Sequence, residues 1–164
     1  MSIRLAILVG LCCLVVWSGM VVAVFRRVQP RVLLLGEILV SDPRSLSIFY
    51  QDQFDALFDY PLYSLVQGNQ NSNGDGLLAG KGFPLQIKSL LDEEAERYPE
   101  ASQAVRFFNN HDTNRIATEV KGDMARQKLA ATLLVSLPGP IMVYYGEEIG
   151  MLGQKGTAPY WDSY

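Results

Sequence analysis

Four short hydrophobic runs dominate the pattern of this chain. They cover residues 32–36, 54–58, 105–109 and 140–145, and the longer stretches between them carry apolar residues at helical spacing. The continuous branched run at 31–36 is typical of a strand in a parallel sheet that is buried on both faces. Strands that alternate with helices predict an α/β fold built from β/α repeats, with all strands parallel.

Two helices are predicted in the second half of the chain. Pro84 suits the first position of a helix that ends before Tyr98 and Pro99. Its apolar positions at helical spacing are Ile87, Leu90, Leu91 and Ala95, and we expect this helix to pack on the outside of the barrel. Asp123 is a candidate N-cap for the second helix, which Pro138 and Gly139 end. Its apolar row is Leu129, Leu133 and Leu137, with Ala130 and Leu134 beside it.

Acidic residues follow two of the predicted strands. Glu37 comes directly after the first run, and Asp112 follows the run at 105–109. Because the carboxyl ends of parallel strands meet at one edge of a sheet or barrel, we expect both carboxyls at the same rim. Glycoside hydrolysis uses a pair of carboxyl groups that flank the scissile bond. The pattern therefore indicates glycosyl transfer chemistry.

A structural interpretation of the same residues stays open at this level. A glutamate after a strand is more often a solvated loop residue, and a single histidine, here His111, is usually structural. Asn110 and Asp112 both suit a turn or a helix N-cap. Glu147 and Glu148 can shape the rim as polar loop residues.

Four ordered segments resemble the α-amylase family of retaining glycoside hydrolases. They are residues 34–37 (LLGE), 107–115 (FFNNHDTNR), 137–140 (LPGP) and 144–151 (YYGEEIGM). The resemblance runs from about residue 29 to residue 164. It implies the second half of a TIM (β/α)8 barrel, about strands five to eight, and this half is incomplete as a barrel because eight strands take roughly 250 residues.

The resemblance also assigns roles to individual residues. Glu37 matches the general acid, which later acts as the base, and Asp112 matches the carboxylate that stabilises the transition state. His111 matches a residue that binds substrate hydroxyls. Asn110 and Arg115 are expected to support these groups. The implied substrate is an α-glucan or oligosaccharide, and α-amylase, α-glucosidase and transglycosidase activities stay open as alternatives.

The nucleophile expected from the family has no counterpart in this chain. The family carries an Asp two residues after an Arg at the end of the fourth strand, upstream of the position of Glu37. No Asp or Glu precedes Glu37. We therefore expect the isolated chain to be inactive. Four strands of a barrel also leave two open edges, which predicts self-association.

The N-terminal segment is the second distinctive region. Residues 5–25 contain no charged side chain, and Arg4 and Arg26 flank them. A membrane anchor, a signal peptide and a spurious extension are the three interpretations of residues 1–28, with the partial barrel at 29–164. A membrane location or secretion follows only if the segment is genuine. The alternative function is then a membrane-anchored, non-catalytic relative that serves as a binding or transporter-associated subunit.

Composition excludes several other classes. A net charge of −3, from 14 basic and 17 acidic residues, lacks the basic footprint of a nucleic-acid binder. Cys12 and Cys13 are adjacent and offer neither a disulfide framework nor metal-ligand spacing. The Asn- and Gly-rich loop at 69–82 imitates the opening of a calcium loop, but Gly82 stands where the closing glutamate belongs. We expect no metal and no cofactor.

Overall fold

Three parallel strands form the sheet, and they follow one another in chain order. The computed structural model describes residues 20–51, 53–68, 75–100 and 103–155. The strands are β1 (Leu35–Gly36), β2 (Ala56–Phe58) and β3 (Ala104–Val105). β1 pairs with β2, and β2 pairs with β3, both in parallel. This order is the one that consecutive β/α repeats produce.

A fourth extended segment lies beside the continuation of β3. Arg106 and Ile141 form a parallel bridge. The backbone N–H of Arg106 donates to the carbonyl of Pro140 at 2.8 Å, and the N–H of Met142 donates to the carbonyl of Arg106 at 2.8 Å. The parallel arrangement of the four predicted runs is therefore confirmed, although each regular strand is shorter than its hydrophobic run.

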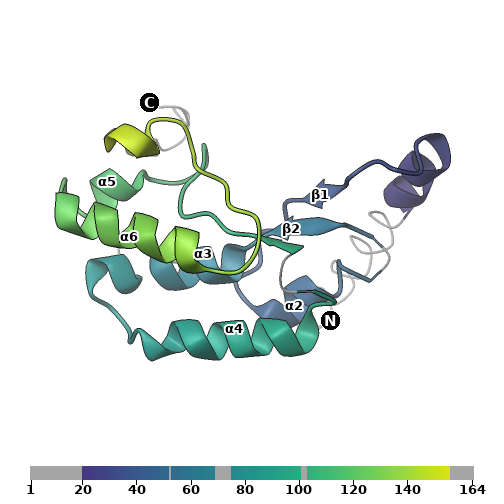
Figure 1. The fold of residues 1–164 in the computed structure, drawn as a ribbon, viewed down its shortest axis with the longest axis horizontal. Helices are drawn as coiled ribbons and strands as arrows, with labels where there is room; N and C mark the ends of the chain where they lie inside the picture. The colour runs from purple at the N-terminus through teal and green to yellow at the C-terminus, as the bar shows by residue number, and fades with distance from the viewer. Residues whose placement is uncertain (1–19, 52, 69–74, 101–102, 156–164) are drawn as a thin grey trace, which may run out of the picture.

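Helical segments precede, connect and follow the strands. They are residues 20–28, α2 (Pro43–Ser47), α3 (Tyr60–Val66), η1 (Leu77–Ala79), α4 (Leu85–Arg97), α5 (Ile116–Glu119), α6 (Met124–Ser136) and η3 (Glu147–Ile149). Figure 1 shows α6 and α4 on either side of α3, with the strands toward the other end of the molecule. The helices and the sheet together bury the core.

Local sequence sets the ends of these helices. The Asp123 carboxylate accepts hydrogen bonds from the backbone N–H groups of Ala125 and Arg126 at the start of α6, which confirms the predicted cap. Pro84 immediately precedes α4, and Tyr98 ends that helix in an extended conformation. Both predicted helices are therefore confirmed to within about one residue at each end.

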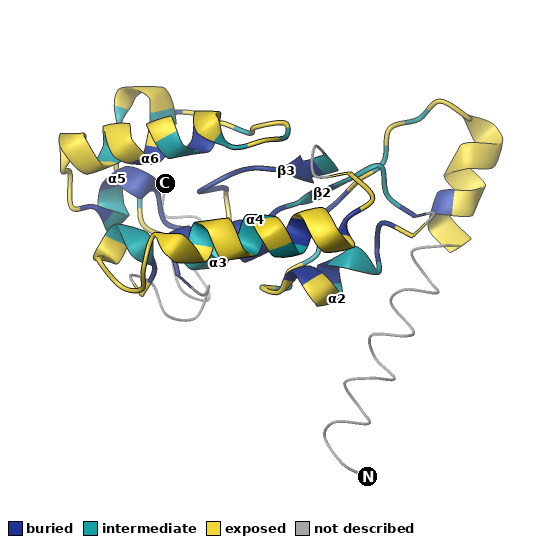
Figure 2. Cartoon of the chain, turned by 60° about the horizontal axis from the view of Figure 1, so that its bottom comes forward, coloured by how far each residue is buried: buried dark blue, intermediate teal, exposed yellow. Residues whose placement is uncertain are grey.

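The buried faces of the two long helices include only part of the apolar rows in the sequence. In α6, Ala130 and Leu134 are buried while Leu129 is exposed. In α4, Ala95 is exposed and Glu94 is buried. Figure 2 shows α4 and α6 exposed along their outer faces, whereas β3 is buried. Leu129 and Ala95 therefore lie outside the buried faces, although both belong to the apolar positions at helical spacing.

The prediction that residues 31–36 are buried on both faces was also wrong. Leu33 is 72 % exposed and Leu35 is 43 % exposed. Ile141 and Val143, on the opposite outer strand, are exposed as well. Within the described ranges, no element covers these apolar rows on the two outer strands. The central strands β2 and β3 are covered, and Leu57 and Ala104 are fully buried.

The predicted N-terminal apolar segment lies mostly outside the described residues. Residues 5–19 are not described, and residues 20–25 belong to the helix at 20–28. Among the residues that the structure describes, no helix has the length and apolar character needed to cross a bilayer. Residues 69–74 of the predicted loop also lie outside the description, and the rest of that loop contains η1.

Candidate active site

The structure brings Glu37 and Asp112 to the same edge of the sheet. The Tyr60 hydroxyl donates a hydrogen bond to Glu37 Oε1 at 2.7 Å. Asn110 Nδ2 donates to the Tyr60 hydroxyl oxygen at 3.2 Å, and Asn110 Oδ1 accepts from the Asp112 backbone N–H at 2.9 Å. A single hydrogen-bonded path thus links the carboxyl ends of three strands. The prediction that both acids share one rim is confirmed.

Tyr60 is the centre of this path, and the sequence analysis missed it. The residue directly follows Asp59, which caps α3, so the end of β2 fixes its position. Its buried ring packs edge-on against Phe107, with centroids 5.1 Å apart. Burial, followed by the hydrogen bond to Glu37, raises the pKa of the Tyr60 hydroxyl, which is therefore a stable donor at neutral pH. Its position two residues beyond the end of β2, near a strand end as Glu37 is, was the available signal.

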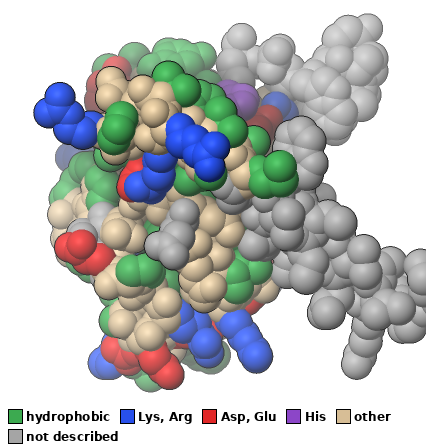
Figure 3. Space-filling view, turned by 90° about the vertical axis from the view of Figure 1, so that its right-hand side faces the viewer, with side chains coloured by type: hydrophobic (Ala, Val, Ile, Leu, Met, Phe, Trp, Pro, Cys, Tyr) green, Lys and Arg blue, Asp and Glu red, His purple; other side chains and the backbone are tan. Residues whose placement is uncertain are grey.

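Asn110 organises the loop that carries His111 and Asp112. The Asn110 carbonyl accepts from the Thr113 backbone N–H at 3.3 Å, and the Thr113 hydroxyl accepts from the Asn110 backbone N–H at 2.9 Å. Asn110 is buried, while His111 and Asp112 are exposed, with His111 Nε2 3.3 Å from Asp112 Oδ2. Figure 3 shows the single histidine of the chain at the surface. Residues 110–113 therefore form a turn, and this turn presents the side chains of His111 and Asp112 to solvent.

Lys155 adds a cation to this rim that no sequence pattern indicated. Its ammonium group lies 3.0 Å from Asp112 Oδ1 and donates to the His111 carbonyl at 3.1 Å. Its backbone N–H donates to Asn114 Oδ1 at 2.7 Å. The Lys155 side chain is only 16 % exposed, although that of Asp112 is 44 % exposed. The segment at 150–155 therefore holds the loop at 110–114 in place.

Arg115 is buried against two aromatic rings, in keeping with a supporting role. Its guanidinium carbon lies 4.5 Å from the ring centroid of Tyr145 and 4.9 Å from that of Tyr144. It also donates to the Tyr145 carbonyl at 2.5 Å.

The neighbouring Glu147 carboxylate accepts a hydrogen bond from the Tyr144 backbone N–H. When the Asn109 amide is oriented to satisfy both of its neighbours, its nitrogen donates to Glu147 Oε2 at 3.1 Å. Burial raises the pKa of Glu147. Glu147 thus takes part in shaping the rim.

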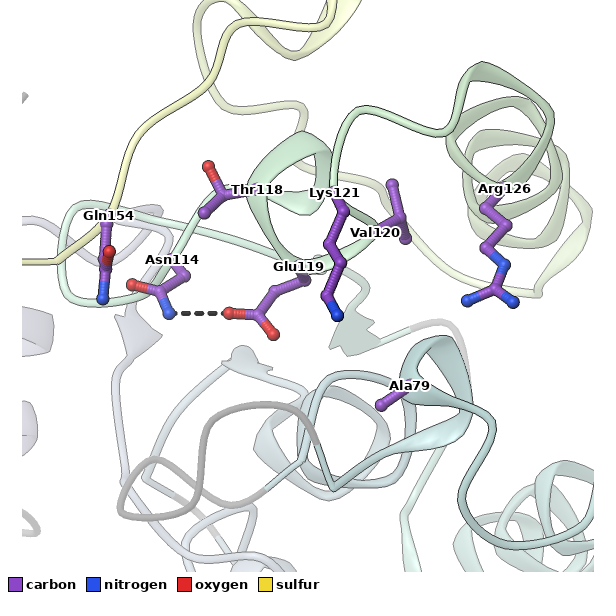
Figure 4. Close-up of a pocket in the computed structure, with 8 residues that line it drawn as sticks. All are labelled: Ala79, Asn114, Thr118, Glu119, Val120, Lys121, Arg126 and Gln154. Carbon is purple, nitrogen blue, oxygen red and sulfur yellow. Dashed lines mark hydrogen bonds between the residues drawn. The ribbon is translucent and has the colours of Figure 1, made fainter.

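A separate polar pocket of about 470 Å³ lies beside the turn between α5 and α6. Figure 4 shows Asn114 pointing toward Glu119, to which its Nδ2 atom donates at 2.6 Å. The lining residues are Ala79, Asn114, Thr118, Glu119, Val120, Lys121, Arg126 and Gln154. None of the five predicted site residues lines this pocket. The candidate chemistry therefore lies at the open rim, where carboxyl groups can approach a solvent-borne substrate.

The described residues offer no competing metal chemistry. Within residues 20–51, 53–68, 75–100 and 103–155, no three His, Cys, Asp or Glu side chains are grouped so that they could hold a metal ion. What the rim presents is an exposed pair of carboxyls, an imidazole, and a buried tyrosine and asparagine that fix them. Such a set can donate a proton, accept hydrogen bonds from hydroxyl groups and stabilise positive charge.

Comparisons with known proteins identify the family of this chain. The family model of the alpha amylase catalytic domain matches residues 14–162. Neopullulanase 2 of Thermoactinomyces vulgaris is 40 % identical over 135 residues, which cover 79 % of this chain and 21 % of that protein. The maltogenic alpha-amylase of Bacillus acidopullulyticus is 32 % identical over 133 residues, again 79 % and 21 %.

The solved structures that resemble this chain include alpha-amylases as well. The crystal structure of an alpha-amylase from Anoxybacillus matches with a TM-score of 0.72 and 26 % identity, over 88 % of this chain and 31 % of that one. An alpha-amylase from Geobacillus thermoleovorans, complexed with acarbose, matches with a TM-score of 0.69 and 27 % identity, over 85 % and 31 %. The chain thus spans about a fifth of the length of its curated relatives. The family-model match over most of its length shows that the chain belongs to the α-amylase catalytic-domain family.

Proposed function

We propose that this chain supplies the acid/base and substrate-stabilising part of a retaining glycoside hydrolase site that acts on α-glucans. The observation that carries the proposal is the path from Glu37 through Tyr60 and Asn110 to Asp112, which keeps two carboxyls at one rim. The names of the relatives, neopullulanase and maltogenic alpha-amylase, support starch-like glucans or their oligosaccharides as substrates. We further propose that the four strands correspond to strands five to eight of the barrel.

The residues of the rim divide the chemistry between them. Glu37 protonates the leaving glycosidic oxygen and then, as the base, activates the incoming water. Asp112 accepts hydrogen bonds from sugar hydroxyls and stabilises the positive charge that develops on the ring. His111 donates to hydroxyls of the same sugar. Asn110 and Arg115 have positioning roles. Asn110 fixes the turn that carries His111 and Asp112, and Arg115 holds the rings of Tyr144 and Tyr145.

The proposal includes inactivity of the isolated chain. A retaining mechanism needs a carboxylate that attacks the anomeric carbon, with the two catalytic carboxyls about 5 Å apart. The chain has no acid before Glu37, where the family places that group, and Asp112 has the stabilising role. Loss of the attacking group commonly costs several orders of magnitude in rate, because only binding and electrostatic effects are left.

Turnover assays test the catalytic part of the proposal. The purified chain is incubated with maltooligosaccharides and with 4-nitrophenyl α-glucoside, next to a Glu37→Gln variant. We expect no release above that variant. Release that is present in the wild type and lost in Glu37→Gln would show that another group of the chain attacks the sugar, and the inactivity proposal would then be wrong.

A binding experiment tests the substrate class independently of turnover. Maltoheptaose is titrated into the 15N-labelled chain, and we expect the amide signals of His111 and Asp112 to shift. Asp112→Asn should weaken this binding, because a neutral amide accepts hydrogen bonds less strongly than a carboxylate. Asp92→Asn, at an exposed position on α4, is the matched control. Shifts that spread over the surface, or equal binding by both variants, would contradict the proposed site.

A further inference from the structure

Three charged side chains lie completely buried beneath the rim. Arg106 continues β3, Asp59 precedes α3, and Glu94 lies in α4, and each side chain is 0 % exposed. The candidate chemistry at the rim uses none of them. Because buried charges are expensive unless they are paired, this cluster requires a physical account.

One guanidinium group serves both carboxyls. Arg106 Nη1 donates to Asp59 Oδ2 and also to Glu94 Oε2, the latter at 2.7 Å. Arg106 Nε donates to the Pro138 carbonyl at 2.8 Å. Asp59 Oδ1 accepts from the Leu62 backbone N–H at 3.0 Å, which caps α3. The cluster therefore joins the sheet to α3, to α4 and to the segment after α6.

The charges of the cluster do not balance if both carboxyls are ionised. Two negative groups then face one cation, which leaves a net charge of −1 away from water. Among the residues that the structure describes, the other titratable side chains that face the cluster are Tyr50 and Tyr98, and neither supplies a compensating positive charge. Burial first, and then the charges of Asp59 and Glu94, raise the pKa of both hydroxyls, which stay neutral. A single bound proton makes the cluster neutral.

We propose that Asp59 and Glu94 share one proton around Arg106, and that loss of this proton in mildly alkaline solution loosens α4 from the sheet. We refer to Asp59, Glu94 and Arg106, with their one shared proton, as the pH-sensitive latch. Asp59 is adjacent to Tyr60, whose hydroxyl holds Glu37, so the latch lies one residue from the candidate active site. The proposal concerns the fold alone, and it does not depend on any catalytic activity.

The expected direction of the pH effect follows from the proton count. Burial, and next the charge of Asp59, raise the pKa of Glu94 from its ordinary value of 4.5 to about 8, although Arg106 opposes this shift. Burial also raises the pKa of Asp59. Between pH 5 and 8 the folded chain then holds a proton that the unfolded chain has lost. Stability is fully present below this window and decreases as the pH rises through it.

Urea unfolding at pH 6, 7, 8 and 9 tests the latch. For the wild-type chain we expect the unfolding constant to rise by up to about tenfold per pH unit as far as pH 8. Glu94→Gln, whose amide resembles the protonated acid, should remove this dependence. Glu93→Gln, which breaks an exposed pair with Arg97 on the same helix, should keep it. The proposal would be overturned if the unfolding constant of the wild-type chain did not depend on pH. It would also be overturned if the unfolding constants of Glu94→Gln and wild type changed with pH in the same way.

A second measurement decides the matter even if Glu94→Gln fails to fold. The wild-type chain, labelled with 13C at aspartate and glutamate carboxyls, is titrated by NMR from pH 4 to pH 9. We expect a signal of Asp59 or Glu94 to move in the mildly alkaline range, and the Glu94 signal to titrate in the acidic range in Asp59→Asn. If every aspartate and glutamate titrates below pH 6, the shared proton does not exist.

Discussion

The rim and the buried cluster use the same kinds of side chain in opposite surroundings. At the rim, Asp112 pairs with Lys155 and stays 44 % exposed. In the cluster, Asp59 pairs with Arg106 and both are fully buried. An exposed pair contributes little to stability but leaves its carboxylate accessible to a substrate, whereas a buried pair determines protonation and helix position. The carboxylate of Asp112 is therefore accessible for chemistry, whereas the carboxylate of Asp59 has a structural role.

The two regions meet at consecutive residues. Asp59 belongs to the cluster and Tyr60 belongs to the rim, and both stand at the junction of β2 and α3. The ring of Tyr60 packs with Phe107 and Tyr63 in a compact aromatic group between them. Since these rings are buried and closely packed, a shift of α3 would move the hydroxyl that holds Glu37.

The largest effect should come from removing the cation of the cluster. Arg106→Met keeps a long side chain but leaves two carboxyls buried without a positive partner. We expect a loss of about 3–5 kcal/mol in the free energy of unfolding, measured by urea denaturation at pH 7. Arg97→Met on the surface of α4 is the control, and it should cost about 1 kcal/mol or less. Equal losses in the two variants would remove the distinction between buried and exposed pairs.

A smaller effect is expected at the connection between the two regions. Tyr60→Phe removes the hydroxyl that donates to Glu37 and accepts from Asn110, and we expect a loss of about 1 kcal/mol in unfolding free energy. A double-mutant cycle with Glu37→Gln should give a measurable coupling energy, since the two groups are in contact. The matched cycle of Tyr60→Phe with Glu93→Gln should be additive. Additivity in both cycles would show that Tyr60 and Glu37 are energetically independent.

The sequence predicted those features that depend on local chemistry. The hydrophobic runs located the four strands, and Asp123 marked the start of α6, because capping and strand pattern depend on a few neighbouring residues. The shared rim of Glu37 and Asp112 followed from parallel order alone. The strand lengths could not be predicted, because they depend on hydrogen bonds between distant segments.

Two of the features that sequence reasoning missed, the burial of Glu94 and the contact of Lys155, depend on partners far along the chain. A charged residue in a helix is normally assigned to solvent, so Glu94 was passed over in favour of the adjacent Ala95. Only Arg106 and Asp59, from other elements, explain its burial. Lys155 is 43 residues away from Asp112, and nothing in its own neighbourhood indicates the contact. Glu37 was found because its position at a strand end was informative, and Tyr60 could have been found in the same way.

The smallest effect should come from the rim pair of Asp112 and Lys155, in which the Asp112 carboxylate is in contact with water, and this effect should depend on salt. Lys155→Met removes the ammonium group from Asp112 and His111 while keeping most of the side-chain length, and we expect a loss below about 1 kcal/mol in unfolding free energy. The difference from wild type should shrink in 1 M NaCl, where the screening length is about 3 Å. The difference for Arg106→Met should persist in the same salt, because water and ions do not reach the buried cluster. Urea unfolding of both variants at low and high salt measures this contrast. An equal response to salt would mean that burial does not distinguish Asp112 from Asp59.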